Sequence, residues 1–335
     1  MQNFRIAALA TVAMMATSAF MGAQAKTKNI TIGTNKAGSV FFLLGNGFSK
    51  HIQKNLKIRA NAQPHAGSSV YLPLVNNGEV TIGVNNSLDI GSAVRGQAPF
   101  RKKLSNLSVL ARVWIIPFGM MVKNNSSIKS IADVRGKRFV TDVTSVVSLG
   151  RLNRLYLASA GMTVKDVISV KSGGVVKNVN MVVEGRVEAA NIGLGMPQVR
   201  KAHATVPGGI RFVGLGPNAS DEFIMNYAPG AYGYVGKPSK TRPYITEPVR
   251  CLAFDTYLDV GPAVSNDLAY KITKLLHRDW KKLQKAYPPI RGTKSIVPAT
   301  NSAVYHPGAV KYYKEAGVWT AANAKQQAKV AKETR

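Results

Sequence analysis

Apolar and polar positions follow one another in this chain as a short strand, a polar turn and a helix. The run Asn29–Ile32 alternates as a half-buried strand does. Beyond the turn 33–38, apolar residues recur at positions 41, 44, 48 and 52, and this spacing predicts an amphipathic helix. Ser39 is predicted to cap that helix, because its hydroxyl can accept from the free N–H groups of the first turn.

The turn before this helix is a candidate anion-binding site. Free N–H groups and the positive end of the helix dipole attract negative charge, and Lys36, Ser39 and Phe41 lie around the turn. The spacing matches neither a P-loop nor a GxGxxG fingerprint, so an ordinary strand-to-helix turn is the alternative. The site hypothesis gains weight because the chain repeats the same order three more times.

Two of these repeats complete the first part of the chain. A strand over 57–62 and a turn over 63–67 precede a helix over 68–76, which Ser68 or Ser69 can cap. Another strand, over 80–84, runs into a polar segment. In open α/β sheets, ligands bind at the carboxyl edge of the strands. The residues predicted to bind a ligand at this edge are Lys36, Ser39, Phe41, His65, Gly67, Ser68, Ser69, Asn85 and Ser87. For His65, donation to an anion and a structural role are both open.

The third repeat lies in the second half of the chain, behind a long apolar run over 107–122 that could cross between two lobes. A strand over 138–140 leads to a polar turn and a helix that ends at Gly161. A later strand over 187–192 ends at a Gly-Met-Pro turn. This half therefore contributes Thr144, Ser145, Gly195 and Met196 to the predicted site.

The rest of the chain predicts a return to the first lobe. Val249–Val260 is strand-like, and 267–287 has the pattern of one long amphipathic helix. A last helix over 309–316 follows His306, and the tail 321–335, which has no apolar stripe, is expected to be loosely held. No structure is assigned to 207–242. The predicted organisation is a signal peptide over 1–25, one lobe formed by 26–117 with 250–335, and a second lobe over 118–249.

The N-terminal residues indicate the cellular compartment, and the net charge bears on the possible partners. Residues 1–25 combine one basic residue, an apolar stretch and an Ala-Gln-Ala site, which is typical of a cleavable signal peptide and predicts a periplasmic protein. The chain has 45 Lys and Arg against 16 Asp and Glu, a net charge of +29. Export argues against a nucleic-acid partner. Either the basic residues form an ordinary solvated surface, or their field attracts small anions or anionic lipid headgroups.

Motifs for catalysis are missing from the sequence. It contains no GxSxG, no HExxH and no paired cysteines, and its five histidines have no ligand spacing. Cys251 is the single cysteine, so an intramolecular disulfide is excluded. Hydroxyl, amide and helix-end donors without acid–base partners predict a binding site that needs no metal or cofactor, rather than an active site.

Four segments carry a resemblance to a known family. They are ITIGTNKAGSVFFLLGNGFSKHI, HAGSSVYLPLVNNGEVTIGVNNS, the stretch from SIADVRGKRFVTDVTS to SAGMTVKDV, and HPGAVKYYKEAGVW. With them, the chain from about 29 to 319 resembles the TAXI family, the substrate-binding subunits of TRAP (tripartite ATP-independent periplasmic) transporters.

The resemblance implies an α/β, two-lobed periplasmic binding protein of type II-like fold, in which each lobe is a mixed sheet flanked by helices. It also implies a monomer that captures a small organic acid, glutamate- or 2-oxoglutarate-like, between the lobes. The acid would be delivered to TRAP membrane subunits for uptake driven by an ion gradient. Lys36 and His65, which depart from the family pattern, favour an anion. The alternatives are a basic surface protein that binds polyanions or anionic lipid headgroups, and a periplasmic enzyme.

Overall fold

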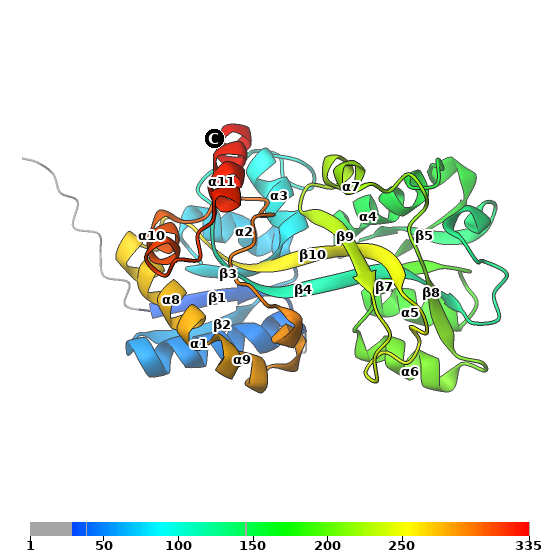
Figure 1. Ribbon diagram of the computed structural model, residues 1–335, viewed down its shortest axis with the longest axis horizontal. Helices are drawn as coiled ribbons and strands as arrows, with labels where there is room; N and C mark the ends of the chain where they lie inside the picture. The colour runs from blue at the N-terminus through cyan, green and yellow to red at the C-terminus, as the bar shows by residue number, and fades with distance from the viewer. Residues whose placement is uncertain (1–28, 38, 145, 335) are drawn as a thin grey trace, which may run out of the picture.

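The computed structural model describes residues 29–37, 39–144 and 146–334 of the chain. The predicted signal peptide over 1–25 and Ser145 lie outside the described residues. Figure 1 shows two lobes side by side, joined by two long strands that run from one lobe into the other. Each lobe is a sheet flanked by helices, and each has its own cluster of buried apolar side chains. The α/β fold predicted from the sequence, with two lobes, is confirmed.

The first lobe, called lobe I here, begins with the strand–turn–helix repeats read from the sequence. Its elements up to the first crossing are β1 (Asn29–Thr34), α1 (Val40–Leu56), β2 (Arg59–Pro64), α2 (Ser68–Asn77), β3 (Ile82–Asn86) and α3 (Ser87–Arg95). The strand β1 pairs in parallel with both β2 and β3. Parallel pairing brings the carboxyl ends of all three strands, and the starts of the three helices, to one edge. The helical spacing read for α1 is confirmed, since Leu44, Phe48 and Ile52 are fully buried.

Two strands cross between the lobes, β4 (Ser108–Lys123) and β10 (Val249–Val260), as the apolar runs predict. They pair antiparallel over almost their whole length. β10 also pairs with β3 in lobe I, whereas the far end of β4 pairs with lobe II strands. Both ends of β4 are buried, but Trp114–Pro117 in its middle is only partly covered. The middle of β4 therefore lies at the junction of the lobes, where helices no longer cover the sheet.

Lobe II is built from the segments between the two crossing strands. Its elements are β5 (Arg138–Val143), α4 (Val147–Ala158), β6 (Ile168–Ser172), α5 (Val175–Val183), β7 (Ala190–Gly193), α6 (Pro197–Thr205), β8 (Ile210–Val213), α7 (Asp221–Tyr227) and β9 (Ala231–Gly236), with 3-10 turns at Ile131–Val134 and Val164–Asp166. β5 and β6 pair in parallel, β7 and β8 pair with β4, and β9 pairs with β10. The segment 207–242, unassigned from the sequence, thus supplies β8, α7 and β9.

After β10 the chain returns to lobe I and differs from the prediction of one long helix. It forms α8 (Asn266–Arg278), α9 (Trp280–Ala286), a 3-10 turn (Pro288–Gly292), α10 (Pro307–Glu315) and α11 (Ala321–Thr334). The predicted helix over 267–287 breaks at Asp279, whose carboxylate bonds to Arg278 and pairs with His51 of α1 at 2.9 Å. The buried indole of Trp280 donates to the Thr293 carbonyl at 2.9 Å. The contacts with His51 and Thr293 turn the chain after α8. The helical periodicity of 267–287 gives no information about these two partners, because both lie outside that segment.

The tail is the second correction. It was expected to be loosely held, but it forms α11, which packs against lobe I (Figure 1). Side-chain amides anchor it: Gln327 bonds to both backbone groups of Tyr305, and Gln326 donates to Asn301. Side-chain hydrogen bonds therefore hold the helix to lobe I. A search of the sequence for an apolar stripe does not detect such bonds. Within the residues that the structure describes, we find no helix long and apolar enough to span a lipid bilayer.

Candidate functional site

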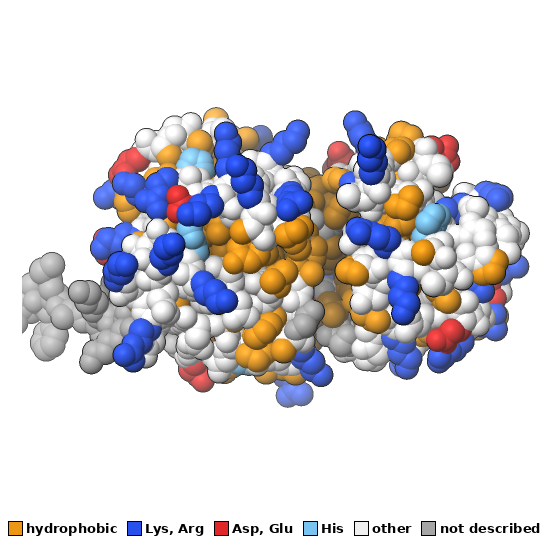
Figure 2. Space-filling view, turned by 90° about the horizontal axis from the view of Figure 1, so that it is seen from below, with side chains coloured by type: hydrophobic (Ala, Val, Ile, Leu, Met, Phe, Trp, Pro, Cys, Tyr) orange, Lys and Arg blue, Asp and Glu red, His pale blue; other side chains and the backbone are white. Residues whose placement is uncertain are grey.

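The candidate site is the groove between the two lobes, which Figure 2 shows as a hollow with hydrophobic side chains along it. Helix N-termini from both lobes are brought to this junction, because α1, α2, α4 and α5 each follow directly on a parallel strand. Free N–H groups at such ends favour anions. The described residues of the predicted site lie at or just before the starts of α1, α2, α3, α4 and α6, in surroundings that differ in exposure.

At the start of α1 the predicted cap is confirmed. The Ser39 hydroxyl accepts from the Phe42 N–H at 3.1 Å, and the Ser39 N–H donates to the carbonyl of Lys36. The Lys36 side chain is exposed. Phe41 packs edge-on against Trp114 in the middle of β4, with ring centroids 6.0 Å apart. This contact fixes the first turn of α1 against the uncovered part of the crossing strand.

At the start of α2 the expected serine cap is wrong. Gly67 is the N-cap residue, with extended backbone and no side-chain cap. The Ser68 hydroxyl instead donates to Oδ2 of Asp89 in α3, and Ser69 is exposed. His65 stacks on Tyr71 with centroids 5.3 Å apart, and burial lowers its pKa. His65 is therefore a neutral imidazole at neutral pH, not the positive charge that anion binding would use.

Asn85 and Ser87, both predicted to contact the ligand, lie beneath the groove and are fully buried. Asn85 donates to Oδ1 of Asp259 at 2.8 Å. The Ser87 hydroxyl donates to the carbonyl of Gly230 at 2.5 Å and accepts from the N–H of Asp255 at 3.1 Å. Both side chains are buried because β10 pairs along β3 and covers them, which corrects their expected place at an open strand end.

Lobe II places its predicted residues at the opposite side of the junction. Thr144 is exposed at the end of β5, and its hydroxyl donates to the Ser172 carbonyl at 3.3 Å. Gly195 is exposed, and a Cβ built there meets no atom within 4 Å. Met196 precedes α6 and is partly buried against the lobe II core. Ser145 lies outside the described residues.

The structure adds Arg151, which the sequence reading missed. Arg151 lies in α4, and one of its guanidinium nitrogens donates to the Gln97 side chain of lobe I at 3.1 Å. Burial lowers its pKa, while attraction to Asp89 of lobe I opposes that shift. Arg151 thus reaches from one lobe toward the other. The sequence does contain one indication of Arg151. It lies four residues after Val147, so both side chains share a face of the predicted helix, and this face differs from that of the buried Leu152.

Asp89 is the matching group on lobe I. It is buried in the first turn of α3, and its Oδ2 accepts from Ser68 and, at 2.6 Å, from the side chain of Asn86. A carboxylate at a helix start is stabilised by the dipole. Arg151 and Asp89 therefore place a positive and a negative group on opposite lobes. Beyond the bond to Gln97, no described residue accepts from the Arg151 guanidinium, so it retains donors for a carboxylate.

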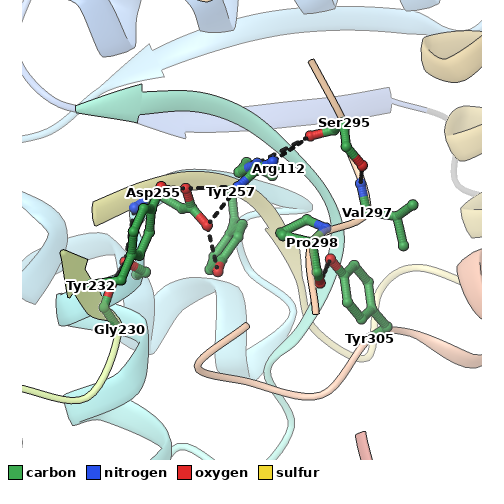
Figure 3. Close-up of polar contacts among 10 residues, drawn as sticks. Arg112, Gly230, Tyr232, Asp255, Tyr257, Ser295, Val297, Pro298 and Tyr305 are labelled. Atoms are coloured by element: carbon green, nitrogen blue, oxygen red, sulfur yellow. Dashed lines mark hydrogen bonds and ion pairs between the residues drawn. The ribbon is translucent and has the colours of Figure 1, made fainter. Parts of the chain in front are cut away.

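Beneath the groove, a polar network ties the crossing strands together (Figure 3). Asp255 of β10 accepts from Tyr232 of β9 at 2.7 Å and from Tyr257 at 3.3 Å, and pairs with Arg112 of β4 at 3.4 Å. Arg112 also donates to the carbonyl of Ser295 at 2.9 Å. Burial raises the pKa of Asp255, and the positive charge of Arg112 opposes the shift. Asp255 and Tyr257 are buried, whereas Arg112 and Tyr232 remain partly exposed, so the network joins the crossing strands and is open to its surroundings at these two side chains.

Two hollows of the described structure lie away from the predicted site residues. One, of about 250 Å³, is lined in lobe II by 129–132, Ala160 and 213–217. The other, of about 380 Å³, is lined on lobe I by Lys281, Gln284, Lys285 and Arg291. None of the predicted site residues lines either hollow. These two hollows are therefore separate from the predicted site.

We also searched the described residues for a metal site and for a reactive cysteine. No group of three or more His, Cys, Asp or Glu among them is arranged to hold a metal ion. Cys251 is fully buried, and burial raises the pKa of its thiol to about 12, so a thiolate is not available at neutral pH. The hydrogen-bond donors at the groove are the helix starts of both lobes and the Arg151 guanidinium.

A model of the NMT1-like family matches residues 32–317, and the chain belongs to this family. Among solved structures, XAC2383 from Xanthomonas citri bound to ATP is 11% identical with a TM-score of 0.53, over 92% of this chain and 100% of that one. PhnD1 from Prochlorococcus marinus in complex with methylphosphonate is 15% identical with a TM-score of 0.52, over 88% and 100%. At these identities the likenesses show the fold alone.

The family assignment corrects one interpretation of the sequence. The four segments were interpreted as a resemblance to the TAXI family of TRAP transporter subunits. The family whose model covers residues 32–317 is instead the NMT1-like family, and PhnD1, which shares the fold, is in complex with a phosphonate. The segments quoted for the resemblance are largely strand–turn–helix units. Such units recur wherever this two-lobed fold occurs. They therefore identify the fold more reliably than they identify the particular family.

Proposed function

We propose that this protein is an extracytoplasmic solute-binding protein, which captures a small organic acid between its lobes and delivers it to the membrane component of an uptake transporter. The observation that carries the proposal is Arg151 of lobe II, whose guanidinium reaches lobe I at Gln97 and has no other hydrogen-bond acceptor among the described residues. Helix starts on both lobes add N–H donors. Since a buried carboxylate is costly without several donors, convergence of such donors supports an acid as the solute.

Lobe closure follows from the same geometry. The lobes are joined by the two crossing strands, and hinge closure around a ligand is a common motion of such proteins. The uncovered middle of β4, at Trp114–Pro117, would become buried when a solute and the second lobe cover it. The protein would act by binding and release, without turnover. Its place outside the cytoplasm is supported by the signal peptide predicted for residues 1–25.

The test is ligand binding to the purified mature protein. Native mass spectrometry identifies any acid retained during purification, and a thermal-shift panel of organic acids finds others. The variant Arg151→Gln is expected to weaken acid binding by about tenfold to a hundredfold, the worth of hydrogen bonds to a charged group. Arg154→Gln on the same helix is the matched control, because Arg154 pairs with Asp142 at 2.6 Å. Equal loss in both variants, or no acid bound at all, would contradict the proposal.

A second candidate, binding of polyanions or anionic headgroups, is favoured by one observation. The hollow of about 380 Å³ on lobe I is lined by three cations, Lys281, Lys285 and Arg291, and by no acidic residue. Binding there would weaken steeply with added salt, whereas binding in the groove would respond little. Titration of the bound acid at low and high ionic strength therefore separates the two candidates.

A further inference from the structure

We propose that the solute is a monocarboxylate with an apolar body, such as a branched-chain or aromatic acid, and not a dicarboxylate. This inference rests on the proposed function, and it names the class of acid that the groove accepts. Three features carry it: exposed apolar side chains on the groove edges, an apolar floor, and the sign of the charge that faces Arg151.

Large apolar side chains remain exposed in the first turns of the helices that start at the groove. Leu43 is 46% exposed, Val70 and Val147 are each 49% exposed, and Val176 is 44% exposed. Each lies in the first turn of a helix, in α1, α2, α4 and α5, which follow β1, β2, β5 and β6. Single exposed apolar residues are ordinary on a protein surface. Exposed apolar residues in the first turns of four helices that start at the groove, two from each lobe, are not accounted for in that way.

Val147 can be placed on the inner side of the groove. It lies four residues before Arg151 in α4, so the two side chains share one face of the helix. The Arg151 guanidinium bonds to Gln97 and is attracted to Asp89, both in lobe I. The helix face that bears Val147 is therefore turned toward lobe I, and its exposed side chain is available to a solute between the lobes.

The floor of the groove is apolar as well. The uncovered middle of β4 consists of Trp114, Ile115, Ile116 and Pro117, all partly exposed. Phe41 at the start of α1 packs against Trp114 and extends this surface to the edge of lobe I. A solute that contacts the floor therefore meets rings and branched side chains rather than hydrogen-bond donors.

The charges disfavour a second acid group. The group that faces Arg151 is Asp89, whose carboxylate would repel another carboxylate. Arg95 is also near Arg151, but its guanidinium is occupied by the carbonyls of Gly91 and Ser302 and by Glu333. His65 is neutral at neutral pH, because burial lowers its pKa. Among the groups around Arg151, one acid group thus finds its partner in the Arg151 guanidinium, and the adjoining part of the solute meets an apolar surface.

The experiment measures affinity along a homologous series by calorimetry with the full mature protein. The series is 2-oxobutyrate, 2-oxopentanoate and 4-methyl-2-oxopentanoate, with 2-oxoglutarate as the dicarboxylate. Affinity should rise by about fourfold for each methylene buried, and 2-oxoglutarate should bind more weakly than the branched acid. A flat series, or tightest binding of 2-oxoglutarate, overturns the inference while the proposed function stands. If none of the four acids binds to the folded protein, the inference is overturned, whereas the proposed function fails only if native mass spectrometry and the thermal-shift panel also find no bound acid.

A pair of variants locates the apolar contact. Val147→Asn should reduce the affinity for the branched acid by about tenfold and leave that for 2-oxobutyrate almost unchanged. Ile168→Asn is the matched control, since Ile168 is 56% exposed at the first residue of β6, the end away from the groove. Both substitutions are at exposed positions, so the thermal midpoints of the free proteins should not differ. If Val147→Asn leaves the whole series unchanged, the exposed edge serves another purpose, such as docking to the membrane component, and the inference is overturned.

Discussion

Asp259 is a carboxylate in the middle of lobe I that offers a sharp test of the structure. It is fully buried in β10, and its Oδ1 accepts from the Asn85 side chain at 2.8 Å. Two buried atoms beside this bond, Oδ2 of Asp259 and Oδ1 of Asn85, have no hydrogen-bond partner among the described residues. One proton on Asp259 satisfies both, because the acid then donates to the amide oxygen while it accepts from the amide nitrogen.

The size and sign of the effect follow from the pKa. Burial raises the pKa of Asp259 from 3.8 to about 7, and the bond from Asn85 opposes the shift. Below about pH 4 the carboxyl is protonated in both the folded and the unfolded chain, so folding carries no penalty. As the pH rises from about 4 to about 7, the unfolded chain releases this proton and the folded chain keeps it, so stability falls. Three pH units at 1.36 kcal/mol each make the loss about 4 kcal/mol at most.

The variant Asp259→Asn removes the titration and keeps the geometry. Its amide can accept from Asn85 and donate back to it, as the protonated acid does. We therefore expect the variant to be more stable than the wild type above pH 7, by up to about 4 kcal/mol, and nearly equal to it at pH 4. Urea unfolding at pH 4, 5.5, 7 and 8.5 measures the difference. Asp267→Asn, at an exposed residue that pairs with Lys271, is the control and should show no such trend.

The reasoning would be refuted if the wild type and Asp259→Asn had the same pH dependence between pH 4 and 8.5. A variant that is less stable at every pH would also refute it, because it would mean that the ionised carboxylate is favourable in the folded state. The comparison needs no ligand, so it tests the packing of lobe I independently of the proposed function.

Substitutions at three further sites test local features. Gly83→Ala puts a methyl group into the space that the Asp259 side chain fills, and it should lower the free energy of unfolding by about 1–3 kcal/mol in urea titration; an unchanged midpoint would contradict the packing. Ser39→Ala removes the cap of α1 and should cost about 1 kcal/mol, whereas Ser39→Asp should retain the stability, as thermal unfolding can show. Gly230 has a φ of 96°, and a Cβ there would lie 2.7 Å from the Ser87 carbonyl oxygen. Gly230→Ala should therefore cost at least 1 kcal/mol in urea unfolding, and a neutral result would mean that this lobe contact is loose.

Much of the local structure is determined by the sequence itself. The cap at Ser39, the face of α1 with Leu44 and Phe48, and the bounds of β10 were all predicted correctly. These features depend on residues within a turn or two of each other, so their periodicity and capping chemistry can be read without knowing where the rest of the chain lies. The order of strand, turn and helix likewise determined the α/β class.

Other elements depend on partners far along the chain. The helix predicted over 267–287 is divided at Asp279, which pairs with His51 more than 200 residues earlier. Asn85 was expected at an open strand end, but β10 covers it and supplies Asp259 as its partner. No window of sequence contains both members of these pairs, so local patterns cannot foresee them.

The candidate site shows the same division. The sequence located the helix starts that meet at the groove, because each follows a strand and a polar turn. It did not identify Arg151 and Asp89 as opposed groups, since they lie 62 positions apart and on different lobes. The crossing strands decide which helix faces which, and only that arrangement turns an arginine on the surface of one helix into a donor for a solute held between two lobes.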